Sequence, residues 1–278
     1  MSDGIPWSQV GGWLWQQRDS IAEAVKKVLA WFRKPDGSDR GILILGAGGV
    51  GKTTLARILS GKYDWLLDEP WKYGESFGIE RFKLKDDEKV QVVVPPGQTA
   101  RRETTWTELL ANVAGGKYRG VILVSANGCH SIATSSYKDH PLYKGNKDDF
   151  VTALVKRNRD DEAAILQRLT PHLTVSNGKV WLLTVVAKED LWFPERTAAE
   201  QRLVDELAPR LQAAQAAKGA TNFRHEAVAV SLLISNFVTN DGETLKKNTA
   251  GYDHRQSVES IRRLFEVLNA LQDWEDTK

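Results

Sequence analysis

The chain has 278 residues and a nearly even charge balance, with 38 Lys and Arg against 36 Asp and Glu. That length allows one large core with appendages. The charge balance argues against a dedicated nucleic-acid binder, because such proteins carry a basic surface. The single cysteine, Cys129, cannot form an internal disulfide, and no apolar run approaches the roughly 20 residues of a membrane span. We therefore expect a soluble, cytoplasmic protein that needs neither nucleic acid nor a membrane.

The first segment, residues 1–38, is rich in tryptophan and contains a predicted helix at 18–33. Apolar residues recur in this helix at spacings of three and four, which is the period of one helix face. The turn at 34–40 contains Pro35 and Gly37 and separates the helix from the next strand. We predict a helical extension at 1–38 ahead of a larger domain at 39–278. The sequence leaves open whether the apolar face of this helix contacts its own domain, a partner protein or a membrane surface.

Residues 46–53 follow an apolar strand predicted at 41–45 and precede a helix predicted to run to about residue 61. They match the phosphate-binding motif G-x-x-x-x-G-K-[ST] in full, between a strand and a helix as the motif requires. Its glycines let successive amide N–H groups face phosphate oxygens, and the helix N-terminus adds a positive dipole end. Lys52 would reach the β- and γ-phosphates, and the Thr53 hydroxyl would ligate Mg²⁺. The predicted phosphate-binding residues are Gly46, Ala47, Gly48, Gly49, Val50, Gly51, Lys52, Thr53 and Thr54.

Beyond this loop, runs of strand-forming residues alternate with amphipathic helices. The predicted strands are 79–84 and 89–94, which form a hairpin, and 120–126, 179–187 and 227–234. The predicted helices are 102–114, 147–172, 197–217 and 255–272. This order predicts an α/β fold with a mostly parallel central sheet flanked by helices, and ligands outside the carboxyl ends of the strands. The stretch between the strands at 120–126 and 179–187 is long, so we predict an insertion within about 131–178 that serves partner recognition.

Three later segments carry polar residues at the ends of predicted strands. They are Glu75–Glu80 before the hairpin, Val94-Pro95-Pro96-Gly97-Gln98 at its end, and Ala187-Lys188-Glu189-Asp190 after an apolar strand. Together with the phosphate loop, these segments resemble the Ras-like small GTPases of the translation-factor-related class of P-loop proteins. The resemblance covers roughly residues 41–272.

The resemblance implies a role for each matching residue. Ser76 stands where a Thr of the family ligates Mg²⁺. The Gly97 amide would bond the γ-phosphate, and Gln98 would orient the attacking water. Val94 replaces the family's Asp, which holds Mg²⁺ through water, and Pro95 and Pro96 stiffen the turn. These departures predict slow or partner-activated hydrolysis.

Asp190 decides the predicted base preference. A carboxylate accepts hydrogen bonds from guanine N1–H and the 2-amino group, whereas adenine offers no such pair of donors. The aliphatic stem of Lys188 would lie over the base. Ala187 replaces the Asn of the family motif, which should weaken base affinity without reversing the preference. For the family's remaining base contact, a Ser-Ala pair, the sequence offers Ser235-Asn236 as a candidate.

We therefore predict a GTP- and GDP-binding switch that uses Mg²⁺ and hydrolyses GTP slowly, with Lys52 and Gln98 as catalytic residues. We expect it to interact with a protein effector or activator. Two alternatives stay open, namely an ATP-binding signalling or defence NTPase and a pseudo-GTPase that does not hydrolyse. The sequence also leaves open whether a homodimer forms across the nucleotide. Cys129, His130 and His140 lack a recognised metal-ligand spacing.

Overall fold

The computed structural model describes residues 41–60, 76, 78–84 and 87–277, and within 83–90 it describes only the backbone. The predicted extension at 1–38 lies outside the described residues. Most of the segment before the hairpin, 61–75 and 77, also lies outside them.

Six strands form one sheet in the order β2-β3-β1-β4-β5-β6. The antiparallel pair is β2 with β3, and every other neighbouring pair in this sheet is parallel. This confirms the predicted mostly parallel α/β sheet. The strands are β1 (Gly41–Gly46), β2 (Glu80–Leu84), β3 (Asp87–Val94), β4 (Tyr118–Ser125), β5 (Val180–Val186) and β6 (Phe223–Ala229).

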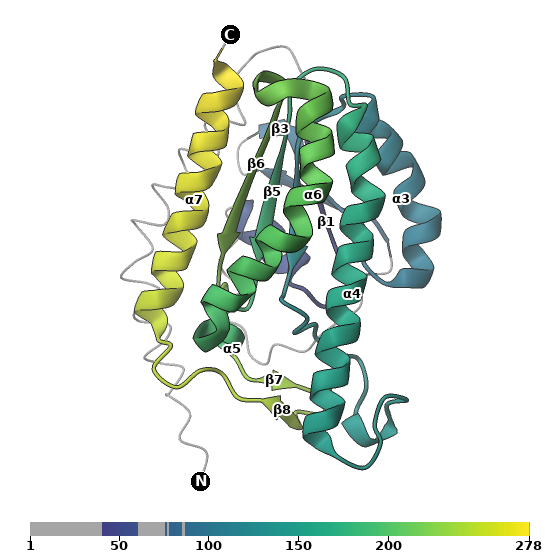
Figure 1. Cartoon of the computed structure of the whole chain (residues 1–278), viewed down its shortest axis with the longest axis vertical. Coiled ribbons are helices and arrows are strands. Elements are labelled where there is room, and N and C mark those ends of the chain that lie inside the picture. The colour runs from purple at the N-terminus through teal and green to yellow at the C-terminus, as the bar shows by residue number, and fades with distance from the viewer. Residues whose placement is uncertain (1–40, 61–75, 77, 85–86, 278) are drawn as a thin grey trace.

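Helices cover both faces of the sheet. Parallel strands joined by right-handed crossovers place α3, α4 and α6 on one face, where they lie side by side (Figure 1), and α2 on the other. Helix α2 contacts β1 and β3, and α7 contacts the edge strand β6. The helices are α2 (Lys52–Leu59), α3 (Thr99–Ala114), α4 (Lys147–Thr174), α5 (Glu189–Trp192), α6 (Arg196–Asn222) and α7 (His254–Asp276).

The central strands β1, β4 and β5 are buried along their whole length. Their sequences are mostly apolar because helices cover them on both faces. The main core therefore lies between these strands and the helices, and it fixes where the loops at the carboxyl ends of the strands can lie.

The last strand differs from the prediction. Residues 227–234 were expected to form it, but β6 spans Phe223–Ala229. It is the edge of the described sheet, and its polar residues Arg224, His225 and Glu226 are partly exposed. An edge strand needs no continuous apolar run, so the apolar pattern pointed to residues too far along the chain. The correction places Ser231 at the carboxyl edge of the sheet.

A second, smaller core lies beyond the carboxyl ends of the strands, near α5 at the lower end of Figure 1. The hairpin of β7 (Phe237–Val238) and β8 (Thr244–Lys246) packs there against the N-terminal half of α4. The segment 131–178 consists of part of the loop before α4, the short helix η2 (Tyr137–Asp139) and α4 itself. That it forms an insertion stays a prediction. The buried members of this core are Cys129, Phe150, Leu154, Val186, Leu191, Trp192, Ala199, Phe237 and Leu245.

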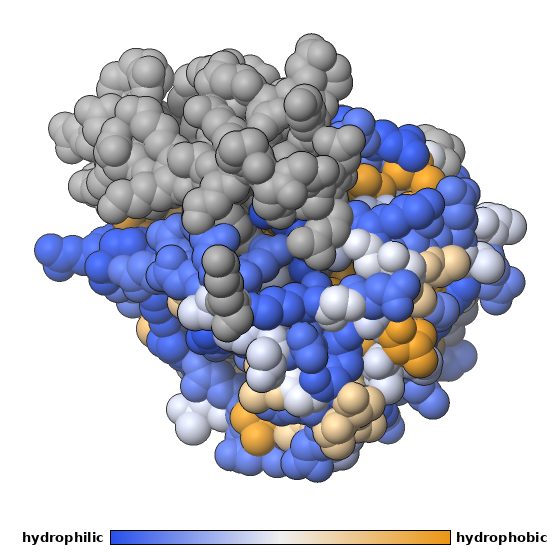
Figure 2. Space-filling model, turned by 90° about the horizontal axis from the view of Figure 1, so that it is seen from above, coloured by the Kyte–Doolittle hydropathy of each residue, from blue (hydrophilic) through white to orange (hydrophobic). Residues whose placement is uncertain are grey.

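The face seen in Figure 2 is mainly hydrophilic where its residues are described, with apolar side chains in small separate areas. Within the described ranges, no helix combines the length and the hydropathy that crossing a bilayer requires.

Candidate functional site

The phosphate loop, residues 46–53, turns sharply between β1 and α2. Gly49 and Gly51 have φ values of 75° and 101°, in the left-handed region that favours glycine. Lys52 begins α2, and its Nζ donates a hydrogen bond to the Ala47 carbonyl at 2.7 Å. The loop therefore closes around the ammonium group, and its amides precede a helix N-terminus as a phosphate site requires.

Lys52 is buried, and its surroundings disfavour its charge. Burial and the neighbouring Arg102 lower the pKa of Lys52 to about 7, against the opposing effect of Glu80 and Asp161. A phosphate group beside this ammonium would favour the charged form. The loop is thus electrostatically suited to a polyanion.

Gly97 lies directly against the phosphate loop. A Cβ at this position would come within 2.3 Å of Lys52 Nζ and 2.5 Å of the Ala47 carbonyl oxygen. The preceding carbonyl, that of Pro96, accepts a hydrogen bond from Trp106 Nε1 at 3.0 Å. The N-cap residue of α3 is Gln98, whose Oε1 is buried with no hydrogen-bond partner among the described residues. The structure thus brings Gly97 to the phosphate loop, and Gln98 is the next residue along the chain.

The two predicted Mg²⁺ ligands meet at one carboxylate. Thr53 Oγ1 donates to Glu80 Oε2 at 3.1 Å, and Ser76 Oγ donates to Glu80 Oε1 at 2.6 Å. All three groups are oxygen donors, which is the chemistry that Mg²⁺ selects, so these residues fit the ion. Sequence reasoning did not single out Glu80, since a lone Glu at the start of a strand carries no motif.

Arg101 connects this group to α3. Its Nη1 donates to the Ser76 carbonyl at 2.7 Å, while its neighbour Arg102 forms an ion pair with Asp161 of α4 at 2.5 Å. Arg101 therefore connects α3 to Ser76, and Arg102 connects α3 to α4.

Lys188 connects the phosphate loop to the end of β5. It adopts a left-handed conformation with φ 61°, and its Nζ donates to the Cys129 carbonyl at 2.7 Å and to Ser131 Oγ at 2.9 Å. The Ser131 amide in turn donates to the Gly49 carbonyl at 3.0 Å. Burial lowers the pKa of Lys188 to about 8. One residue, Ser131, thus joins the two predicted halves of a nucleotide site.

Asp190 is fixed by the loop that follows β6. Its Oδ1 accepts a hydrogen bond from Ser231 Oγ at 2.7 Å, and its Oδ2 accepts one from the Ser235 amide at 3.0 Å. Burial raises the pKa of Asp190 to about 6, against the opposing effect of these hydrogen bonds. The candidate pair Ser235-Asn236 therefore contributes a backbone amide to Asp190, whereas the hydroxyl that Asp190 accepts comes from Ser231. The sequence prediction placed residue 231 inside a strand at 227–234 and so did not identify it as a site residue.

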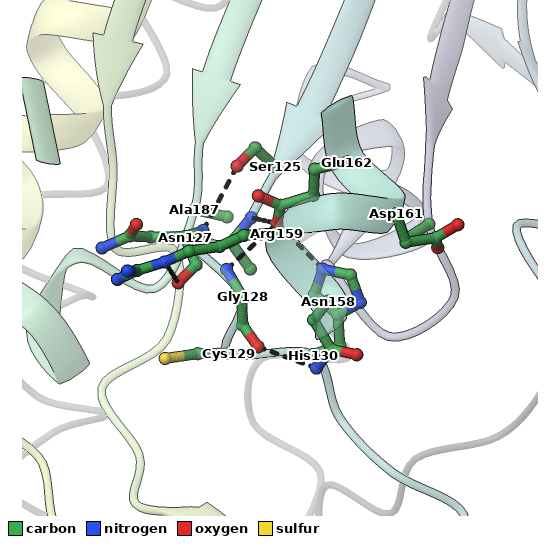
Figure 3. Close-up of polar contacts among 12 residues, drawn as sticks. Ser125, Asn127, Gly128, Cys129, His130, Asn158, Arg159, Asp161, Glu162 and Ala187 are labelled. Carbon is green, nitrogen blue, oxygen red and sulfur yellow. Dashed lines mark hydrogen bonds and ion pairs between the residues drawn. The ribbon is translucent and has the colours of Figure 1, made fainter. Parts of the chain in front are cut away.

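Glu162 of α4 holds the loop that carries Ser131. As Figure 3 shows, it lies beside the backbone of Gly128 and the ring of His130, and its Oε1 accepts from the amides of Ala126 and Gly128 at 2.8 and 3.2 Å. His130 Nε2 lies 2.8 Å from the same oxygen. Burial alone would raise the pKa of Glu162, but the hydrogen bonds from His130 and Ala126 lower it. Sequence reasoning missed this residue.

The described residues hold no cluster of three or more His, Cys, Asp or Glu that could bind a metal ion by themselves. Cys129 is buried, and burial raises the pKa of its thiol. His140 packs against the Phe150 ring with centroids 5.2 Å apart. The structure therefore gives Cys129 and His140 packing surroundings and pairs His130 with a carboxylate.

Comparison with known proteins gives weak similarities. No protein-family model and no curated protein matches the chain. Among solved structures, the mammalian SRP receptor is 17% identical at a TM-score of 0.42, covering 84% of this chain and 100% of that one. The GDP-bound SRP receptor SRb from Chaetomium thermophilum is 12% identical at 0.40, covering 82% and 96%. The small COPII coat GTPase SAR1 from Encephalitozoon cuniculi, in complex with GDP, is 12% identical at 0.39, covering 96% and 97%. Similarities at this level carry no argument about function, so the strand order and the phosphate loop define the fold.

Proposed function

We propose that this chain is a divergent Ras-like GTPase that binds guanine nucleotide and hydrolyses GTP slowly as a molecular switch, a proposal supported by its strand order and its phosphate loop. One observation carries the proposal. Ser131 bonds both Gly49 of the phosphate loop and Lys188 at the end of β5. A nucleotide joins its phosphates to its base through one ribose, so the two subsites must be held in a fixed relation.

Asp190 accounts for the guanine preference. An ionised carboxylate has about four lone-pair sites, and Ser231 and Ser235 occupy two of them. The remaining sites can accept from guanine N1–H and the 2-amino group. Adenine would leave these remaining sites of the buried carboxylate unpaired, so it would bind more weakly than guanine.

The phosphate side supports slow hydrolysis. Bound Mg²⁺, held by Thr53 and Ser76, would neutralise phosphate charge, and Lys52 would do the same from the loop. The Oε1 of Gln98, which has no hydrogen-bond partner among the described residues, is available to orient a water. The Trp106–Pro96 hydrogen bond and two consecutive prolines restrain the turn that carries Gln98. A partner protein that repositions this turn would accelerate the reaction.

The switch itself would work through Arg101. This residue joins Ser76 to α3, so the segment that contacts the metal and the turn that contacts the γ-phosphate respond together. Loss of the γ-phosphate would release both. An effector that contacts these two segments would then distinguish the GTP-bound from the GDP-bound protein.

The ATPase alternative needs an acid at the carboxyl end of an apolar strand, close to the metal. Glu189 does not serve, because it accepts from the Tyr252 hydroxyl at 3.0 Å and pairs with Arg263 of α7 at 3.3 Å. Asp190 is held by Ser231 and Ser235 instead of contacting Thr53. A second candidate, a pseudo-GTPase without turnover, is favoured by Val94 and by the restrained turn at Pro96.

The proposal is tested on purified protein by denaturing it, identifying the released nucleotide by chromatography, and titrating GTP, GDP and ATP in the presence of Mg²⁺. We expect guanine preference, and Asp190→Asn should move the preference toward xanthine nucleotides. An adenine preference, or an unchanged preference in Asp190→Asn, would overturn the guanine assignment.

Turnover is tested separately on the same protein. Lys52→Ala should abolish nucleotide binding, while Gln98→Ala should keep binding and slow phosphate release. A folded, GTP-loaded protein that releases no phosphate would establish the non-hydrolysing candidate.

A further inference from the structure

Position 94 lies directly opposite a carboxylate on the neighbouring strand. In the antiparallel pair of β2 and β3, Glu80 is the register partner of Val94. Side chains of directly opposed residues start from Cβ atoms about 4.5–5.5 Å apart. The Cβ atom of Glu80 therefore lies close to the Cβ atom from which an acidic side chain at residue 94 would extend.

The contacts of Glu80 are those that a metal-site acid needs. It accepts the hydroxyls of Thr53 and Ser76, one on each carboxylate oxygen, at 3.1 and 2.6 Å. A hydroxyl that donates its hydrogen to Glu80 keeps its oxygen lone pairs for a cation. Outer-shell acceptors of this kind orient ligands and raise their basicity.

Val94 lies in apolar surroundings that disfavour a charged side chain. Val94 is 1% exposed and belongs to the main hydrophobic core, so a carboxylate there would need to be buried. Glu80 is only partly buried, and it approaches the phosphate loop closely enough for its charge to oppose the lowering of the Lys52 pKa. The acid can thus reach the site from β2 without entering the core.

We propose that Glu80 supplies the carboxylate that position 94 lacks, so that the Mg²⁺ site of this chain is built from Thr53, Ser76 and Glu80. This inference rests on the proposed nucleotide-binding function. Glu80 is four residues from Ser76 in the chain, so binding of the metal would fix both residues at once. The acid is then on β2, opposite Val94 of β3.

The test is a Mg²⁺ titration of the full chain loaded with a fluorescent GDP analogue, with the nucleotide release rate as readout. Glu80→Gln removes the charge at constant size, and Glu103→Gln, at an exposed position on α3, is the matched control. We expect Glu80→Gln to raise the midpoint Mg²⁺ concentration by about 10- to 100-fold. Release in excess EDTA should equal that of the wild type, and Glu103→Gln should match the wild type throughout.

A Glu80→Gln midpoint within about twofold of the wild-type midpoint would overturn the inference while leaving nucleotide binding intact. Failure of the wild-type chain to take up guanine nucleotide would instead overturn the proposed function. If Glu80→Gln does not fold, Glu80→Asp keeps the charge and withdraws it by one methylene, and the inference requires a higher Mg²⁺ midpoint there.

Discussion

Lys52 and Asp190 are two buried ionisable residues whose pKa values are shifted toward neutrality. Burial and Arg102 lower the pKa of Lys52 to about 7, and burial raises the pKa of Asp190 to about 6. In the proposed function both residues act in their charged forms, since Lys52 would contact phosphate and Asp190 would accept from guanine. Between these two values most molecules carry both charges, so a pH optimum for binding follows.

We predict that GTP affinity is highest between about pH 6 and 7. Below this range Asp190 takes up a proton and loses its acceptor, and above it Lys52 loses its proton and its charge. Each limb should approach a tenfold loss per pH unit once the group is titrated. The measurement is the Kd for GTP from pH 5 to 9.

Asp190→Asn supplies the control for this pH profile. With xanthine nucleotide as its ligand, the variant should lose the acid limb attributed to Asp190 and keep the alkaline limb attributed to Lys52. An acid limb of equal depth in the variant would show that another group titrates there.

At the scale of elements, the turn from Pro95 to Gln98 lies between the phosphate loop and α3. Gly97 touches Lys52 and Ala47 on one side, and Trp106 fixes the Pro96 carbonyl on the other. Backbone atoms leave no space for a side chain at Gly97. The turn therefore depends on one glycine.

We predict that Gly97→Ala destabilises the protein by about 1–3 kcal/mol, as overpacking does, and weakens nucleotide binding. The added Cβ would lie 2.5 Å from the backbone of Ala47, which cannot move without opening the phosphate loop. Urea unfolding and GTP titration measure the two effects. Gly115→Ala is the matched control, because its nearest atom would be 3.4 Å away and its φ is −72°. Equal stability of the two variants would contradict the packing argument.

The elements that the sequence predicted well are those with a repeating pattern. Strands β4 and β5 were placed within two residues of their ends because they are apolar on both faces. The phosphate loop was predicted because its residues are contiguous. Glu80 and Glu162 were not, since they act on partners 27 and 32 residues away, Thr53 and His130, with no local pattern. β6 was misplaced because its edge position permits polar residues.

At the scale of the whole molecule, Glu162 connects the helix layer to the site. Its hydrogen bonds hold residues 126–130, and the next residue, Ser131, contacts both Gly49 and Lys188. A carboxylate on α4 thus supports both the proposed phosphate subsite and the proposed base subsite without touching either.

We predict that Glu162→Gln lowers the free energy of unfolding by roughly 1.5–3 kcal/mol and weakens nucleotide binding, because hydrogen bonds to a buried charged carboxylate are weakened and the loop they hold is released. The folded-state pKa of Glu162 lies below its ordinary 4.5, so the ionised residue stabilises the fold above that value. This contribution is lost as the pH falls through the folded-state pKa, and the variant should show a shallower acid loss. Urea unfolding at several pH values measures it.

Glu266→Gln is the matched control for this substitution. Glu266 forms a surface ion pair with Arg262 at 58% side-chain exposure, and its loss should change stability by less than about 1 kcal/mol. A Glu162→Gln variant as stable as this control would show that α4 does not support the loop.

The hydrogen bond from Trp106 to Pro96 gives the molecule a spectroscopic reporter of its own. Trp106 is fully buried, and its indole N–H ends on the backbone of the turn that carries Gly97 and Gln98. The nitrogen-bound proton of an indole gives a separate signal in a ¹⁵N-correlated NMR spectrum. Movement of the turn on nucleotide exchange would lengthen or break this bond and displace that signal, so the conformational state could be followed without a label attached to the protein surface.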